Sequence, residues 1–271
     1  MQRIIINADD LGLNNQVNEA ILHYLETGKI TSSTIMASGE AFCDAVKIAK
    51  QFPSCSFGVH LTIDELTPVT DSTVFEQCGL VKDGMFVKNA YKTLRYKPEI
   101  EEAIYSEWKA QIAKILDSGI NVSHIDSHHH CHTYSFLPQI VNRLSKEFGI
   151  NRVRLNLYSP LLFKFRQKDD SLMLEHSDMP QTSKSPSGSG IADALKRHIG
   201  RKRTNIYLKH HFTTTDYFCS LRYFFANESL TVRFGTIELM CHPGHPSYVM
   251  ETQLLNNIPL KGKDLISYLN L

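Results

Sequence analysis

The sequence predicts an α/β protein with a parallel sheet, either open or closed into a barrel. Over residues 3–156, short apolar segments rich in β-branched residues alternate with segments of helical periodicity. Repeated strand–helix units of this kind favour parallel strands. The chain has 271 residues, a length that suits a barrel better than an open sheet. We therefore expect a single domain over residues 1–271.

Each predicted strand is a short apolar run that ends near turn or polar residues. The first, RIIINA, is apolar enough to be buried on both faces. The predicted strands are 3–8, 31–36, 56–63, 122–127, 152–156 and 236–241.

The predicted helices carry apolar residues three or four positions apart. Asn14 or Asn15 caps the first, and Gly28 ends it. Pro53 stops the second, which covers 41–52. The remaining two are 99–117, the clearest of all, and 137–148.

Three stretches fit this pattern less well. Residues 67–98 have weak periodicity and read as a long excursion, and 178–190 (DMPQTSKSPSGSG) read as a flexible loop. A basic cluster at 196–203 is typical of a solvated helix end, with an anion or nucleic-acid patch as the alternative. The aromatic stretch 217–225 favours core packing over a sugar platform.

Composition excludes several classes of partner. Lys and Arg number 29 against 28 Asp and Glu, a net charge of +1, so we expect no nucleic-acid partner. There is no apolar run long enough for a membrane span and no signal-peptide pattern at the N-terminus. The six cysteines are scattered, as in reduced, cytoplasmic proteins.

Metal-ligand side chains gather where four predicted strands end. In parallel β/α folds the ligand site lies at this edge. Any one of them has an ordinary structural explanation, such as a turn carboxylate or a core histidine. Four strand ends together predict a site, whose candidates are Asp9, Asp10, His60, Asp126, His128, His130, His132, His242 and His245.

The segment HIDSHHHCHTY (124–134) is the strongest local signal. In an extended chain His128, His130 and His132 share one face. Asp126 would orient a ligating imidazole, and a mixed carboxylate and imidazole set suits several divalent ions. A fortuitous histidine tract is the alternative.

Two adjacent carboxylates allow a division of work in a hydrolase. One of Asp9 and Asp10 binds a cation while the other deprotonates water. A histidine in MCHPGHPS (240–247) would protonate a leaving group from the opposite side. Cys241 reads as a buried thiol rather than a nucleophile.

Four motifs in order, NADDLG (7–12), GVHL (58–61), HIDSHHHCH (124–132) and MCHPGH (240–245), resemble those of the YdjC-like carbohydrate deacetylases. The resemblance implies a deformed (β/α) TIM-like barrel, as in the glycoside hydrolase and deacetylase barrels. It also implies removal of N-acetyl groups from an amino sugar or chitooligosaccharide, one divalent ion such as Mg²⁺ or Zn²⁺, and a homodimer.

Carried over by position, the resemblance makes Asp10, His60 and His128 the metal ligands, Asp9 the general base and His242 the general acid. Asp126, His130, His132 and His245 would orient ligands or contact substrate. A metal-dependent phosphoesterase on the same barrel and a non-catalytic sugar-binding homologue are the rival hypotheses. The segment 178–211 has no counterpart in the motif set.

Overall fold

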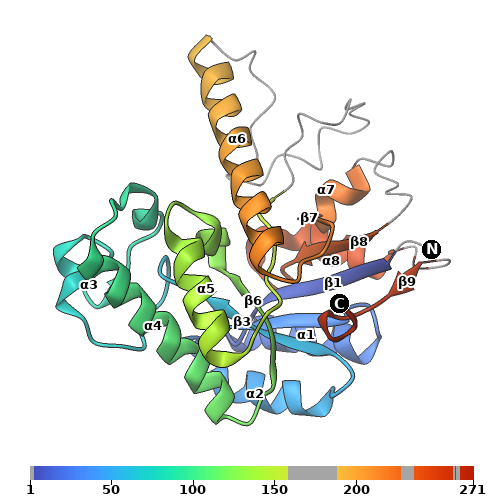
Figure 1. Ribbon diagram of the computed structural model, residues 1–271. Helices are drawn as coiled ribbons and strands as arrows, with labels where there is room; N and C mark the ends of the chain where they lie inside the picture. Colours follow the sequence, from blue (N-terminus) through green and yellow to red (C-terminus); the bar gives the residue numbers. More distant parts are fainter. Residues whose placement is uncertain (1–2, 158–187, 227–234, 259, 261–262) are drawn as a thin grey trace.

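The computed structural model describes residues 3–157, 188–226, 235–258, 260 and 263–271. Its core is a curled, all-parallel sheet in the order β6-β3-β2-β1-β8-β7, with β9 beside the start of β1 (Figure 1). The strands are β1 (Arg3–Leu11), β2 (Ser32–Ile35), β3 (Ser56–Leu61), β6 (Val122–Ser127), β7 (Tyr217–Ser220), β8 (Thr236–Cys241) and β9 (Asp264–Leu265).

Two single bridges extend the sheet beyond β6. Val153 pairs with Ile125 of β6, and Arg152 pairs with Thr213, four residues before β7 begins. The segments around 152 and 213 thus continue the curled half-barrel beyond β6. This arrangement confirms the predicted α/β fold with a deformed barrel of parallel strands.

Helices flank the sheet (Figure 1). They are α1 (Asn15–Glu26), α2 (Phe42–Gln51), α4 (Pro98–Asp117), α5 (Leu137–Phe148), α6 (Gly188–His211), α7 (Leu221–Ala226) and α8 (Val249–Asn256). Helix α6 projects away from the sheet. The Asn14 side chain accepts a hydrogen bond from the Val17 amide and caps α1, as predicted. Within the described part of the chain, no helix combines the length and hydrophobicity of a membrane span.

The predicted excursion at 67–98 forms small elements of its own. They are α3 (Thr73–Gln77), a hairpin of β4 (Val81–Lys82) and β5 (Met85–Phe86), and a 3₁₀ helix (Ala90–Thr93). The apolar side chains Phe75, Phe86 and Tyr91 join the main core. The excursion is therefore packed against the barrel.

The two faces of the sheet differ in chemistry. Ile4, Ile6 and Ala8 of β1 belong to the main apolar core. Their neighbours Asn7 and Asp9 enter a buried polar network with side chains of β2, because successive side chains of a strand alternate between its faces. The polar side chains within the curl include Asn7, Asp9, Ser32, Thr34, Ser56, His60, Asp126 and Glu238.

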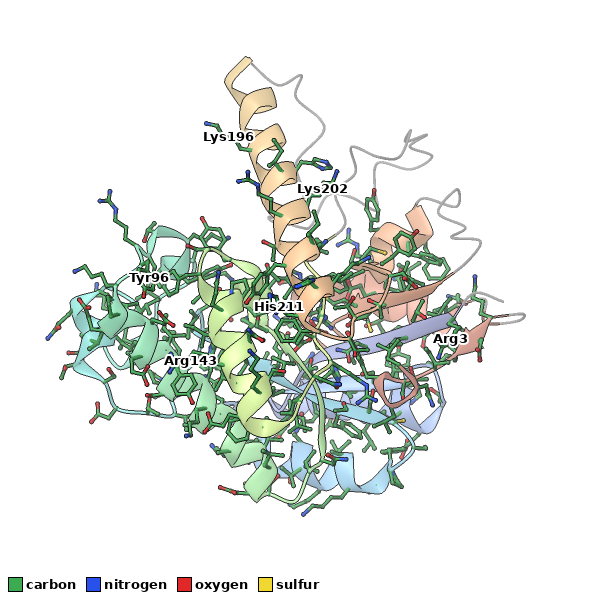
Figure 2. All side chains as sticks on the ribbon, in the orientation of Figure 1. Arg3, Tyr96, Arg143, Lys196, Lys202 and His211 are labelled. Carbon is green, nitrogen blue, oxygen red and sulfur yellow. The ribbon has the colours of Figure 1, made fainter. Side chains whose placement is uncertain are left out.

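Three expectations need correction or placement. Residues 152–156 form only the bridges at Arg152 and Val153 rather than a full strand, because the segment shares backbone hydrogen bonds with only one residue of β6, Ile125, and with Thr213 on its other side. Of the predicted loop 178–190, positions 178–187 lie outside the described residues, and 188–190 begin α6. The basic cluster lies within α6 and not at its end; Lys196 and Lys202 extend into solvent (Figure 2).

The aromatic stretch 217–225 is divided between β7 and α7. Phe218, Tyr223 and Phe224 are buried in the main apolar core. The expectation of core packing is confirmed for these three side chains.

Candidate active site

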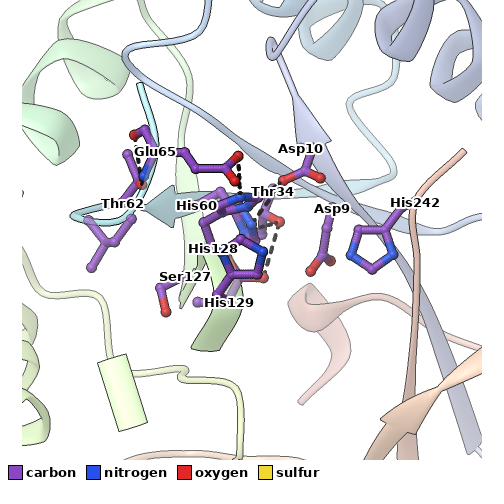
Figure 3. A network of polar contacts seen from close by, with 12 residues as sticks. Asp9, Asp10, Thr34, His60, Thr62, Glu65, Ser127, His128, His129 and His242 are labelled. Carbon is purple, nitrogen blue, oxygen red and sulfur yellow. Dashed lines mark hydrogen bonds and ion pairs between the residues drawn. The ribbon is translucent and has the colours of Figure 1, made fainter. Parts of the chain in front are cut away.

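Asp9 and Asp10 lie at the end of β1, inside the strand rather than after it. Neighbouring strand residues normally face opposite sides of a sheet. Asp10 has a φ of 69°, and the pairing of β1 with β2 shifts between Ala8 and Leu11. This irregularity changes the local alternation of side chains. Both carboxylates are buried close to His60 (Figure 3).

Asp10 meets His60 and His128 in a buried cluster. Its Oδ1 lies 3.2 Å from Nε2 of His60 and 3.0 Å from Nδ1 of His128. One ligand atom of each residue lies within 4.8 Å of the others, close enough to share one ion. A carboxylate with two imidazoles suits several divalent metals, so the donor set fits the ion implied by the sequence.

On each of the two imidazoles, a second carboxylate contacts the ring nitrogen that does not face Asp10. Nδ1 of His60 lies 2.7 Å from Oδ1 of Asp126, and Nε2 of His128 lies 3.2 Å from Oε2 of Glu65. Metal-binding histidines commonly donate their second N–H to such a group, which sets the tautomer and the ring orientation. Both histidines therefore present their other nitrogen to Asp10.

The charges in this cluster depend on one another. Burial lowers the pKa of His60, but Asp126 and Asp10 outweigh it and raise the value to about 10. Burial likewise lowers the pKa of His128, while Asp10 and Glu65 raise it to about 9. Burial raises the pKa of Asp10, yet the two histidines hold it well below its usual value.

Two other groups in the described residues have ligand atoms equally close together. They are Glu65, His128 and His129, and Asp9, His60 and Asp126. In the second group, Asp9 and Asp126 are already paired with the buried guanidinium of Arg154. In the first, His129 is hydrogen-bonded through Nδ1 to the buried Asp64. Both groups overlap the cluster around Asp10.

Asp9 is held by Arg154, a residue that the sequence analysis did not single out. Nη1 of Arg154 donates to Oδ2 of Asp9 at 2.6 Å, and Nη2 donates to Oδ1 at 2.7 Å. The Asn7 amide also donates to Oδ1, at 2.8 Å. The carboxylate is thereby fixed beside the histidine cluster without belonging to it.

His242 follows β8 and lies beside Asp9 (Figure 3). Its amide donates to Oε2 of Glu251 at 2.6 Å, and Nδ1 lies 3.2 Å from the same oxygen. The ring stacks on Tyr248, with centroids 4.2 Å apart. Burial lowers the pKa of His242, but Glu251 outweighs it and raises the value above the usual range.

The histidine-rich segment departs from the expected extended chain. It forms a 3₁₀ helix (His128–Thr133), and His129 and His130 have φ values of 50° and 56°. The expectation that alternate histidines share one face is therefore wrong, because a turn repeats differently from a strand. Two consecutive left-handed residues turn His128 towards Asp10 and His129 towards Asp64.

The remaining candidates, His130, His132 and His245, belong to none of these three ligand groups. His132 uses Nδ1 with Ser127 Oγ and Nε2 with the Arg154 carbonyl, at 2.5 and 3.0 Å. His130 is packed edge-on against Phe218. His245 accepts a hydrogen bond from the Ser247 amide and is half-buried.

Some signals for the missed residues were present in the sequence. Arg154 lies between a valine and a leucine, and Glu238 is the one charge in TIELMC. A charge among such residues needs a buried partner. Glu65 and Glu251 lie in loop or helix segments without such a signal, and their pairing with His128 and His242 depends on the fold.

The family model described as YdjC-like protein matches residues 3–263. The chain belongs to the YdjC-like family. All four sequence motifs fall inside this match, so the resemblance inferred from them is confirmed.

Relatives of this YdjC-like chain carry a functional name. A protein of Halalkalibacterium halodurans named "Carbohydrate deacetylase" is 28% identical over 272 residues, covering 95% of this chain and 97% of the relative. Proteins of the same name from Vibrio parahaemolyticus and Brevibacillus brevis are 39% and 32% identical over 150 and 172 residues. These two alignments cover 55% and 64% of this chain, and 57% and 65% of the relatives.

Among solved structures, the fold is similar to one from Enterococcus faecalis V583 described as a cellobiose-phosphate cleavage protein. The TM-score is 0.64 at 21% identity, and the match covers 99% of this chain and 98% of the other. At this identity the likeness supports the fold alone.

Proposed function

We propose that this chain is a divalent-metal-dependent hydrolase that removes an N-acetyl group from an amino sugar or chitooligosaccharide. The buried convergence of Asp10, His60 and His128, with Asp9 and His242 beside it, carries the proposal. The full-length relative named carbohydrate deacetylase supports the substrate class. The activity would be hydrolysis of a linear amide bond.

Asp10, His60 and His128 would hold the ion, with Mg²⁺ and Zn²⁺ as the proposed candidates. When bound, it would polarise the acetyl carbonyl and lower the pKa of water. Burial supports this set over the group that contains His129, because Asp10, His60 and His128 are all buried, whereas Glu65 and His129 are only partly buried. Asp126 would orient His60 in this role.

Asp9 would act as the general base. Arg154 fixes both of its oxygens, which limits the carboxylate to one orientation. A carboxylate oxygen has two lone pairs. Among the described residues, Oδ2 accepts only from Arg154, so one lone pair remains for a proton of the attacking water.

His242 would act as the general acid towards the departing amine. Glu251 occupies Nδ1, which directs Nε2 as the nitrogen that donates. Despite burial, Glu251 raises the pKa of His242 above its ordinary value, which favours the protonated imidazole that a general acid requires. Stacking on Tyr248 restricts rotation of the ring. The amide nitrogen would thus receive its proton as the C–N bond breaks.

The proposal extends to the remaining candidate residues and to the assembly. His130, His132 and His245 would contact substrate or support ligands. We further propose that the chain is one domain and acts as a cytoplasmic homodimer; sedimentation equilibrium of the purified protein tests the assembly. All six cysteines are free, which is compatible with a reducing compartment.

The function is tested by acetate release from di-N-acetylchitobiose and other N-acetyl sugars. The enzyme is first treated with a chelator and then assayed with Mg²⁺, Zn²⁺, Co²⁺ or Mn²⁺ restored singly. Acetate that appears only with metal is expected. Absence of acetate from every sugar, together with turnover of a phosphate ester, would favour the phosphoesterase. Tight sugar binding without turnover would favour the non-catalytic sugar-binding homologue.

Three variants separate the proposed roles. Asp9→Asn should retain one ion per chain and lose about 10²–10⁴-fold in turnover, the usual contribution of a general base. His60→Ala should lose the ion. His129→Gln should retain the ion and the turnover. Loss of metal in that variant would move the ion to the group of Glu65, His128 and His129.

A further inference from the structure

Arg154 is a fully used hydrogen-bond donor at the centre of the curl. Its five N–H groups meet three buried carboxylates. Nη1 reaches Asp9 and Asp126, Nη2 reaches Asp9 and Glu238, and Nε reaches Glu238, all at 2.6–2.7 Å. Nη1 and Nη2 of the guanidinium face Asp9, whereas Nε and Nη2 face Glu238. The orientation offered to Asp9 therefore depends on Glu238.

Glu238 is in turn bonded to Tyr268, which comes from the opposite end of the sheet. Strand β9 pairs with Arg3 and Ile4 at the start of β1, so the segment 264–271 lies at the amino ends of the strands. From there the Tyr268 side chain enters the curl, fully buried, and its hydroxyl donates to Oε2 of Glu238. The other end of β1 carries Asp9.

The position of Tyr268 is tightly defined. Its ring stacks on His124 with centroids 3.7 Å apart and planes inclined by 9°, and its amide donates to Ser56 Oγ at 3.1 Å. Burial raises the pKa of Glu238 to about 7, while Arg154 and the Tyr268 hydroxyl act to lower it. The hydroxyl thus favours the ionised carboxylate that binds Arg154.

We propose that Tyr268 and Glu238 are positioning residues for the general base. Together they hold Arg154 in the orientation that fixes Asp9. This proposal rests on the proposed function, in which Asp9 deprotonates water. The segment 264–271 would then contribute to turnover although it lies at the end of the sheet opposite the reacting groups.

Tyr268→Phe is the primary test, because it removes one oxygen and keeps the stacked ring. We expect kcat for acetate release to fall about 3- to 10-fold, the effect of losing one ordinary hydrogen bond. KM and the affinity for the ion should change by less than twofold, since Tyr268 is fully buried and contacts Glu238, Ser56 and His124 rather than the proposed metal ligands. Glu238→Gln should lower kcat by at least as much, because it removes the charge that faces Nε.

Thr31→Val is the matched control. Its hydroxyl donates to the Ile266 carbonyl at 2.5 Å and anchors the same segment without touching Glu238. If Tyr268 acts only by holding the segment in place, Thr31→Val will lower kcat as much as Tyr268→Phe does. That result, or an unchanged kcat in Tyr268→Phe, overturns the proposal.

A double-mutant cycle in urea separates failure of this proposal from failure of the proposed function. If the wild-type enzyme releases no acetate, the proposed deacetylase function is refuted. The cycle still tests whether Tyr268 is coupled to Asp9 through Glu238 and Arg154. Unfolding effects usually add when two residues belong to separate hydrogen-bond networks, and fail to add when the residues belong to one network. We expect Asp9→Asn and Tyr268→Phe to be non-additive, and Asp9→Asn and Thr31→Val to be additive. Additivity in the first pair overturns the link.

Discussion

Binding of a divalent ion should release two protons from this site. The pKa values of His60 and His128 are raised to about 10 and 9 in the metal-free protein, so both rings are protonated at pH 7. An imidazole binds an ion only in its neutral form. The ion must therefore displace one proton from each ring, and the carboxylate of Asp10 passes from the two rings to the ion.

The size of the effect follows from this proton count. Each displaced proton changes the apparent association constant about tenfold per pH unit, so two protons give about 100-fold, or roughly 2.7 kcal/mol per unit. Because both folded-state values lie above neutrality, affinity should rise steadily with pH from about 6.5 to 8.5 and level off above the higher pKa. Both rings of the metal-free protein stay protonated throughout this range, so the site should bind most weakly at its acid end.

Calorimetric titration of chelator-treated protein with Zn²⁺ measures the release. At pH 7, the apparent binding enthalpy is recorded in three buffers of different protonation enthalpy. The slope of the apparent binding enthalpy against the protonation enthalpy of the buffer gives the number of protons released. His129→Gln should leave the slope near two. Asp126→Asn should lower it towards one, since it removes the main group that raises the pKa of His60. A wild-type slope near zero would show that both rings are already neutral, and the reasoning would be refuted.

Three further predictions follow from individual contacts. Glu65→Gln should weaken metal affinity about 10- to 100-fold, as is typical when the partner of a ligating histidine is lost; an unchanged dissociation constant in the same titration would contradict the orienting role. Glu251→Gln should lower the pKa of His242, so the imidazole loses its proton at a lower pH. The basic limb of the profile of kcat against pH should therefore move to lower pH, and a limb that stays in place would assign the general acid to another group. Gly58→Ala should cost about 1–3 kcal/mol of unfolding free energy, because a Cβ at this position lies 2.6 Å from His124 Cε1; urea denaturation measures this, and wild-type stability would show that the ring moves freely.

Much of the fold was predictable because it depends on local pattern. The strand at 236–241 and the helix at 137–148 have the predicted bounds, since each combines a clear apolar pattern with nearby turn or capping residues. The site was predictable for a related reason. Parallel strands end at one edge of a sheet, so His60, Asp126 and His242 were expected to be neighbours once strands were assigned.

The contacts that arrange this site were decided by tertiary structure. Arg154 and Asp9 are 145 positions apart in the chain, and no local periodicity relates them. The roles of Glu65 and Tyr268 likewise depend on how a loop and the segment 264–271 meet the sheet.

The backbone at the site was also outside the reach of sequence patterns. Asp10 and His129 adopt left-handed conformations, which non-glycine residues rarely prefer and which surrounding contacts must stabilise. By itself, the sequence determined which side chains arrive at the carboxyl edge, because strand assignment depends on local periodicity. The tertiary structure decided which of them face one another, because packing between distant segments determines register, backbone strain and the pairing of buried charges.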